Sequence, residues 1–232
     1  MSLESISLDK NKPGALGYDE WHQVQMLMRE AFSSVDIPRT QSEIDFFVHW
    51  EDPASFRRSR IDPYAGDFSP GQSFARPRVI RAFDKEDLVG YLYAADNTSG
   101  NIARRLMKMY IPHLIQKKYV WLREIAVHPD YRRQHIGNML GYLALQDRHP
   151  AQSISAYVWR ENEAAISFVE AMGLEETGSK TVNVFGRTNN PAEQVRFAST
   201  VAEVERRLLC VPEVAKLAVK RAVRTPGNAW LV

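Results

Sequence analysis

The chain has 232 residues, of which 44% are hydrophobic and 25% are charged, and its formal net charge is +2. This composition is typical of a soluble globular protein and excludes disordered, collagen-like and disulfide-scaffold classes. The small net charge gives no general attraction to nucleic acid or to a membrane surface, so we expect neither as a partner. The one cysteine, Cys210, cannot form an internal disulfide, which is typical of a reducing compartment.

The chain shows no membrane signal and no internal repeat. No apolar run reaches the ~18 residues of a spanning helix, and no charged-then-apolar leader opens the sequence, so we expect a cytoplasmic protein. A chain of this length buries roughly 70% of its unfolded surface in one core. We expect one domain over residues 1–232, with a motif core at 78–198 and a helical C-terminal extension at 199–232.

The N-terminal third predicts a short strand and two helices. Apolar–polar alternation indicates a strand at 6–8, and helical spacing of apolar residues indicates a helix at 18–32. A capping box at Thr40 predicts a second helix that ends before Pro53. Residues 53–77 are rich in Pro, Gly and Ser and predict a long loop. This loop is either a surface loop pinned by aromatic residues or a substrate-binding lid.

The remaining elements follow from hydrophobic periodicity and from capping residues. The nearly continuous apolar run at 119–127 predicts a central strand. Asn162 predicts the start of a helix that Gly173 ends, and Pro212 predicts the first turn of the last helix. In chain order the pattern predicts a hairpin at 78–93, a helix at 101–117, strands at 119–127 and 153–159 separated by a helix at 136–146, a helix from Asn162, strands at 180–185 and 194–198, and helices within 201–223. This order indicates an α/β (α+β) fold with a mixed sheet.

The segment with the clearest chemistry is residues 127–140, VHPDYRRQHIGNML, between a strand and a helix. Successive backbone N–H groups in such a turn form an anion site, and the helix N-terminus adds about half a positive charge. Arg132 and Arg133 supply guanidinium groups that match phosphate oxygens. The segment therefore favours a phosphate or pyrophosphate ligand, although similar turns occur without one.

Residues 132–137 resemble the acyl-CoA motif Arg/Gln-x-x-Gly-x-Gly/Ala of the GNAT family of N-acetyltransferases. A second family motif, Asn-x-x-Ala-x-x-Phe-Tyr-x-x-x-Gly-Phe, is similar to residues 162–174, where Asn162, Ala165, Phe168 and Gly173 match. One predicted strand separates the two motifs, as in the family. The resemblance covers about residues 119–176, and residues 1–75 and 200–232 carry no further motif.

The resemblance implies an acyl-CoA N-acyltransferase-like fold, with a mixed, mostly antiparallel central sheet flanked by helices. It implies acetyl-CoA as co-substrate, no metal, and direct attack on the thioester by a primary amine of a small molecule or peptide. The backbone of Ile125, Ala126 and Val127 would bind pantetheine and polarise the thioester carbonyl. Asn162 and Phe168 would contact the cofactor from the second motif. The pyrophosphate loop would comprise Arg132, Arg133, Gln134, His135, Ile136, Gly137 and Asn138.

Two positions depart from the family pattern. His135 replaces the first glycine of the acyl-CoA motif; a left-handed backbone there would cost about 1–2 kcal/mol, although histidine is among the residues that adopt it. His135 is either a tolerated substitution or a group that grips phosphate or ribose. Val169 replaces the tyrosine that protonates the thiolate, which removes a general acid typically worth ~10²–10⁴-fold. Tyr157 or a water molecule is a candidate substitute.

Glu124 is the candidate general base, because it adjoins the backbone expected to meet the thioester. Strand alternation predicts that Glu124 and Ala126 share one face of the sheet, and that Arg123 and Ile125 share the other. An alternative is that Glu124 serves only as an ion-pair partner of Arg123 or of another arginine.

The sequence thus predicts an N-acetyltransferase. A CoA-binding sensor or scaffold without catalysis is the alternative, and an interaction protein with accidental motifs is a third. The acceptor amine would be selected by the first 75 residues, the 53–77 loop and the helix before Tyr119. The amphipathic C-terminal helices can pack on the domain itself or on a second copy in a homodimer.

Overall fold

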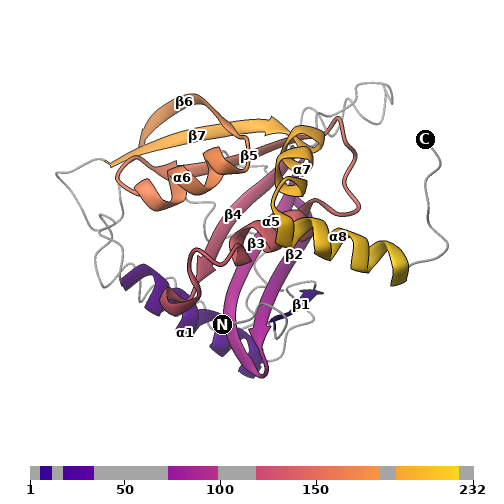
Figure 1. The fold of residues 1–232 in the computed structure, drawn as a ribbon. Coiled ribbons are helices and arrows are strands. Elements are labelled where there is room, and N and C mark those ends of the chain that lie inside the picture. Colours follow the sequence, from indigo (N-terminus) through magenta and orange to yellow (C-terminus); the bar gives the residue numbers. More distant parts are fainter. Residues whose placement is uncertain (1–5, 12–17, 34–72, 99–118, 183–191, 225–232) are drawn as a thin grey trace.

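The computed structural model describes residues 6–11, 18–33, 73–98, 119–182 and 192–224 (Figure 1). The helix predicted from Thr40, residues 53–72 of the predicted loop and the helix predicted at 101–117 lie outside the described residues. The strands are β1 (Ile6–Asn11), β2 (Ser73–Asp84), β3 (Asp87–Thr98), β4 (Tyr119–Val127), β5 (Ser153–Trp159), β6 (Glu175–Val182) and β7 (Ala192–Thr200). The helices are α1 (Tyr18–Ser33), α5 (Ile136–Leu145), α6 (Glu163–Ala171), α7 (Val201–Leu209) and α8 (Pro212–Arg224), and a 3-10 turn, η4, spans Pro129–Tyr131.

The described strands form one sheet in the order β1-β2-β3-β4-β5-β7-β6. The β4–β5 pair is parallel and the other neighbouring pairs are antiparallel. The predicted mixed, mostly antiparallel sheet flanked by helices is therefore confirmed. β4 is the fourth of the seven strands, which explains why its sequence is almost continuously apolar.

Helices cover both faces of the sheet. Tyr91 packs with Val24 and Leu27 of α1, whereas Leu92, its neighbour on β3, belongs to the core that contains α5. Because successive strand residues point to opposite faces, α1 and α5 lie on opposite sides of the sheet. Figure 1 shows β4 passing between them.

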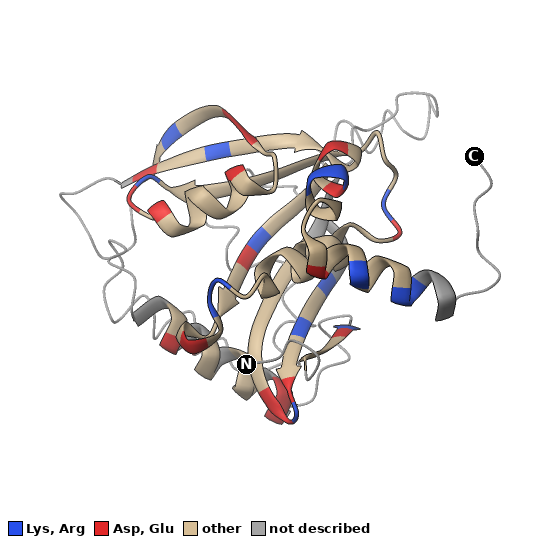
Figure 2. Ribbon diagram, in the orientation of Figure 1, with Lys and Arg blue, Asp and Glu red and all other residues tan. Residues whose placement is uncertain are grey.

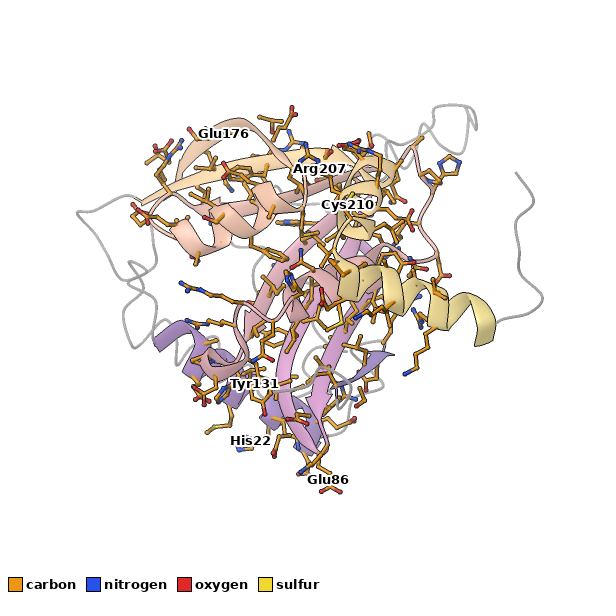
Figure 3. The ribbon with its side chains drawn as sticks, viewed as in Figure 1. His22, Glu86, Tyr131, Glu176, Arg207 and Cys210 are labelled. Atoms are coloured by element: carbon orange, nitrogen blue, oxygen red, sulfur yellow. The ribbon has the colours of Figure 1, made fainter. Side chains whose placement is uncertain are left out.

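The predicted C-terminal extension packs on its own domain. Val204 and Leu208 of α7 and Val214 of α8 are completely buried in the core that contains α5. Gly173, which has a φ of +86°, ends α6 as expected, and a Cβ there would lie 2.8 Å from Arg207 Cγ of α7. Arg207 and Cys210 are labelled at this end of the molecule in Figure 3.

Several strand boundaries differ from the sequence prediction, and the differences at β2 and β6 have a clear reading in the sequence. β2 begins at Ser73, so the last residues of the predicted 53–77 loop belong to a strand. β6 spans Glu175–Val182, not 180–185. β6 is an edge strand whose residues from Glu175 to Ser179 are exposed, and therefore its sequence lacks the apolar alternation on which the prediction depended.

Candidate active site

The candidate site lies where the parallel strands β4 and β5 separate. Their paired residues run from Tyr119–Ser153 to Leu122–Ala156, and no pair follows although β4 continues to Val127. Figure 1 shows the two strands together at one end and diverging toward the other. Beyond Leu122, the edge of β4 that faces β5 is therefore released from the sheet ladder. Its backbone groups need hydrogen-bond partners, which an extended ligand can supply.

A β-bulge in β4 lies at this point and corrects one prediction. Tyr93 of β3 pairs with Glu124 and Ala94 pairs with Leu122, so Arg123 is an extra residue in β4. The Arg123 guanidinium lies 4.9 Å from the Trp121 ring centroid and 5.8 Å from that of Tyr93. Arg123 thus shares the α1 face with Glu124, whereas strict alternation placed the two side chains on opposite faces.

Glu124 is half-buried on the α1 face of the sheet. The Tyr91 hydroxyl donates a hydrogen bond to Glu124 Oε2 across 3.3 Å. Burial raises the pKa of the neighbouring Tyr93 phenol, and the Glu124 charge raises it further. Burial also lowers the pKa of the Arg123 guanidinium to about 10, an effect that the Glu124 carboxylate partly offsets. The carboxylate therefore interacts with two tyrosines and a half-buried cation.

Tyr157 lies on β5, on the same side of the sheet as Trp121. The two rings make an edge-to-face contact with centroids 6.0 Å apart, and Lys180 Nζ lies 4.8 Å from the Tyr157 centroid. Ser155, one strand repeat before Tyr157, is buried, and its Oγ has no hydrogen-bond partner in the described part of the chain. Polar and aromatic side chains of β3, β4 and β5 thus converge on the α1 face near the strand separation.

The loop after β4 is closed by its own hydrogen bonds. His128 Nδ1 accepts from the Asp130 N–H across 3.2 Å, and the Gln134 side-chain amide donates to the Asp130 carbonyl. The hydroxyl of Tyr131, labelled in Figure 3, donates to Asp84 Oδ2 across 3.0 Å. Arg132 donates from Nε to the Val127 carbonyl. These contacts hold η4 against the end of the sheet before the chain enters α5.

Two residues of the Arg133–His135 turn have the left-handed backbone that occurs in anion-binding nests. Arg133 and His135 both have φ near +60°, and His135 is the N-cap of α5. The position of the first motif glycine therefore has a left-handed backbone in this protein, and His135 adopts it. The Met139 N–H donates to the His135 carbonyl across 3.0 Å, which is the first backbone bond of α5. The N–H groups of Ile136, Gly137 and Asn138 precede it and have no intrahelical acceptor. Figure 2 shows basic residues in this loop and no charged residue on α5 itself.

Three predicted site residues from three elements meet behind the loop. A Cβ added to Gly137 would lie 3.0 Å from Phe168 Cε2 of α6 and 3.5 Å from Ile125 Cδ1 of β4. Ile136 is buried in the core and anchors the start of α5, and Asn138 is half-buried. The separation of β4 and β5, the N-terminus of α5 and a glycine closely packed against Phe168 together fit an elongated ligand with a pyrophosphate end.

The residues of the second motif hold α6 in place. Asn162 Oδ1 accepts from the Ala165 N–H across 3.0 Å, so the predicted N-cap is confirmed. Val169, at the family's tyrosine position, is 4% exposed and belongs to the main core. The sequence prediction missed two neighbours of site residues: Tyr91, which donates to Glu124, and Glu213, whose Oε2 lies 3.9 Å from His135 Nε2. Helical and strand periodicity placed both on known elements, but their contacts depend on how those elements pack.

A sheet with one parallel pair that separates, followed by a nest-like turn and a helix N-terminus, defines an acyl-CoA N-acyltransferase-like fold. The chain matches the model of the acetyltransferase (GNAT) family over residues 39–174, and it belongs to that family. No curated protein matched the chain.

Solved structures agree with this fold assignment. The protein smu.2055 from Streptococcus mutans is 15% identical with a TM-score of 0.53, over 84% of this chain and 99% of that one. NAA60 from Arabidopsis thaliana in complex with acetyl-CoA is 14% identical with a TM-score of 0.51, over 84% and 98%. The PaiA N-acetyltransferase from Thermoplasma acidophilum with coenzyme A is 14% identical with a TM-score of 0.50, over 82% and 98%. At these identities the likeness shows the fold alone.

No group of three or more His, Cys, Asp and Glu side chains in the described ranges is arranged to hold a metal ion. Within the same ranges, no helix combines the length and apolarity needed to cross a membrane.

Proposed function

We propose that this protein is an N-acetyltransferase that moves an acetyl group from acetyl-CoA to a primary amine of a small molecule or peptide. The observation that carries the proposal is the continuity of the site. The released edge of β4 leads directly through η4 into the nest at Arg133–His135 and the N-terminus of α5. An extended chain that ends in a pyrophosphate matches this order of backbone donors and acceptors.

Each group of residues has a defined part in this proposal. The backbone of Ile125, Ala126 and Val127 would bind pantetheine. The N–H groups of the loop and of Ile136, Gly137 and Asn138 would bind the pyrophosphate, with the exposed Arg133 as a cation beside them. Asn162 and Phe168 would complete the cofactor site from α6. Acetyl-CoA supplies an activated acetyl thioester, and a backbone N–H aimed at its carbonyl oxygen would stabilise the developing oxyanion.

Glu124 is the proposed general base that takes a proton from the substrate ammonium group. It lies on the α1 face, one residue before Ile125, and a half-buried carboxylate can accept a proton directly or through one water molecule. Val169 cannot donate a proton to the leaving thiolate. Tyr157 is the proposed donor on the same face as Glu124, with water as the alternative.

The test is a transfer assay with a panel of free-amino peptides and small amines, measured as CoA release. We expect Glu124→Gln to lower kcat by roughly 10²-fold or more while acetyl-CoA affinity, measured by calorimetry, stays unchanged. Glu176→Gln, which removes a carboxylate from β6, is the matched control. Unchanged kcat in Glu124→Gln would exclude this residue as the base.

A CoA-binding sensor or scaffold is the second candidate, and the core position of Val169 favours it. Tight acetyl-CoA binding without transfer to any amine of the panel would support this candidate. A cytoplasmic location belongs to the main proposal and is supported by the exposed free thiol of Cys210. A homodimer stays a prediction, which light scattering during size-exclusion chromatography can test.

A further inference from the structure

His135 of the loop and Glu213 of the C-terminal extension face each other. His135 Nε2 lies 3.9 Å from Glu213 Oε2, about 1 Å longer than a hydrogen bond. Glu213 Oε2 is buried, and among the described residues it has no hydrogen-bond partner. The carboxylate thus has an unused acceptor atom directed at the imidazole from a different element of the fold.

The backbones that carry both side chains are held in place by the fold. Val214, the residue after Glu213, is completely buried in the main core, and the Ala215 N–H donates to the Val211 carbonyl across 2.9 Å at the start of α8. His135 is held by its left-handed backbone and by the Met139 N–H, which donates to its carbonyl. The approach of these two residues is therefore a property of the packed fold rather than of two free surface side chains.

The protonation state of His135 decides what the imidazole can do in this position. A neutral imidazole that donates from Nε2 to Glu213 presents an acceptor at Nδ1, which repels a phosphate oxygen. An imidazolium donates from both nitrogens and can bind a carboxylate and a phosphate at once. His135 is about half exposed, so its ring is accessible to a ligand at the helix N-terminus.

Resting on the proposed function, we propose that Glu213 is a positioning residue for cofactor binding. Its carboxylate holds a protonated His135, whose second N–H donates to the pyrophosphate of CoA. The imidazole takes the required proton from solvent when the cofactor binds, so that a carboxylate, an imidazolium and a phosphate form one chain of charge-assisted hydrogen bonds. His135 then compensates for its backbone strain by supplying a donor that a glycine lacks.

The other charged groups described on the loop, α5 and α8 do not take the place of the His135–Glu213 pair. The loop carries the guanidinium group of Arg132, which donates to the Val127 and Ala31 carbonyls, the exposed guanidinium group of Arg133 and the exposed carboxylate of Asp130. α5 has no charged residue. On α8, Lys216, Lys220 and Arg221 are the further charged groups among the described side chains, and all three are exposed. Glu213 is thus the carboxylate that faces His135 from α8.

The experiment is calorimetric titration of the full chain with CoA at pH 7.5 in Tris and in HEPES, which differ in ionisation enthalpy. The difference in observed enthalpy gives the number of protons taken up. We expect an uptake of between zero and one proton for the unaltered protein, and close to none for Glu213→Gln and His135→Asn. Asparagine tolerates the left-handed backbone, so His135→Asn keeps the loop conformation. Each variant should bind CoA roughly fivefold to tenfold more weakly.

Glu205→Gln on α7 is the matched control, because it removes the same charge from the same extension and should leave uptake and affinity unchanged. The double variant His135→Asn/Glu213→Gln should bind no more weakly than His135→Asn alone. Glu213→Asp, which keeps the charge on a shorter side chain, should retain part of the proton uptake. Thermal unfolding checks that every variant is folded.

The experiment distinguishes failure of the Glu213 role from failure of the proposed function. CoA binding without proton uptake, or with the same uptake in Glu213→Gln, would overturn the role of Glu213 and leave the proposed function intact. An additive loss of affinity in the double variant would also overturn it. Absence of CoA binding by the unaltered protein would overturn the proposed function itself.

Discussion

Arg132 Nη2 donates a hydrogen bond to the Ala31 carbonyl across 3.2 Å, while its Nε donates to the Val127 carbonyl. Ala31 lies in the last turn of α1, where carbonyl groups lack intrahelical donors. One guanidinium therefore connects α1 with the end of β4. The sequence suggested that Arg132 and Arg133 both serve a phosphate, but their contacts divide the two residues into different roles.

Substitution separates these roles. Arg132→Gln should lower the free energy of unfolding by about 1 kcal/mol, because a charged donor to two carbonyls is lost. Arg133→Gln should leave stability unchanged and weaken CoA binding, with a smaller salt dependence of affinity than in the unaltered protein. Denaturant unfolding and calorimetry at two salt concentrations measure both effects. Equal effects of the two substitutions on stability would contradict this division.

Gly137 provides a test of the pyrophosphate position. Gly137→Gln should weaken acetyl-CoA binding through bulk, because a Cβ would already lie 3.0 Å from Phe168 Cε2. Gly137→Glu should weaken it further, by roughly tenfold or more relative to glutamine, because a carboxylate beside the helix N-terminus repels phosphate. Calorimetric titration of both variants compares them. Equal affinities would place the phosphates elsewhere.

Asn162 combines a structural role with a proposed cofactor contact. Asn162→Ala should lower the free energy of unfolding by about 1 kcal/mol, because the cap of α6 is lost. Asn162→Asp keeps an acceptor for the Ala165 N–H and should preserve stability, but it replaces an amide with a negative charge and should weaken CoA binding. Thermal unfolding and calorimetry distinguish the two roles. Full CoA affinity in the stable Asp variant would remove Asn162 from the cofactor site.

The ion network around Arg160 predicts a pH dependence of stability. Hydrogen bonds from Arg160, and then from Ser179, lower the pKa of Glu193 from 4.5 to about 2. Because the folded-state pKa is below the ordinary value, this contribution to stability is complete above pH 4.5 and is lost as the pH falls through about 2. The melting temperature of Arg160→Gln should therefore lie below that of the unaltered protein at pH 6, and the difference should shrink toward pH 2.

The pair is exposed, so added salt should also reduce this difference in melting temperature. A difference that stays constant from pH 6 to pH 2 would show that Arg160 contributes through packing and not through Glu193.

Local signals in the sequence predicted much of the fold and the outline of the site. The apolar run of β4, the Asn162 cap, the Gly173 terminus and Pro212 at the start of α8 each act within one turn or strand, so their physical meaning is readable from neighbouring residues. The family resemblance added the sheet type and the proposed cofactor loop. The same motif raised a left-handed backbone at His135 as a condition, and the structure meets it.

Tertiary packing decided what local patterns do not encode. The bulge at Arg123 depends on how β3 pairs with β4, and it moves the Arg123 side chain to the face of Glu124. β6 has little apolar alternation because one edge of the sheet faces solvent. Arg132 meets α1 and His135 meets Glu213 across long separations in the chain. Periodicity specifies which residues share a face, whereas only the packed core specifies which faces meet.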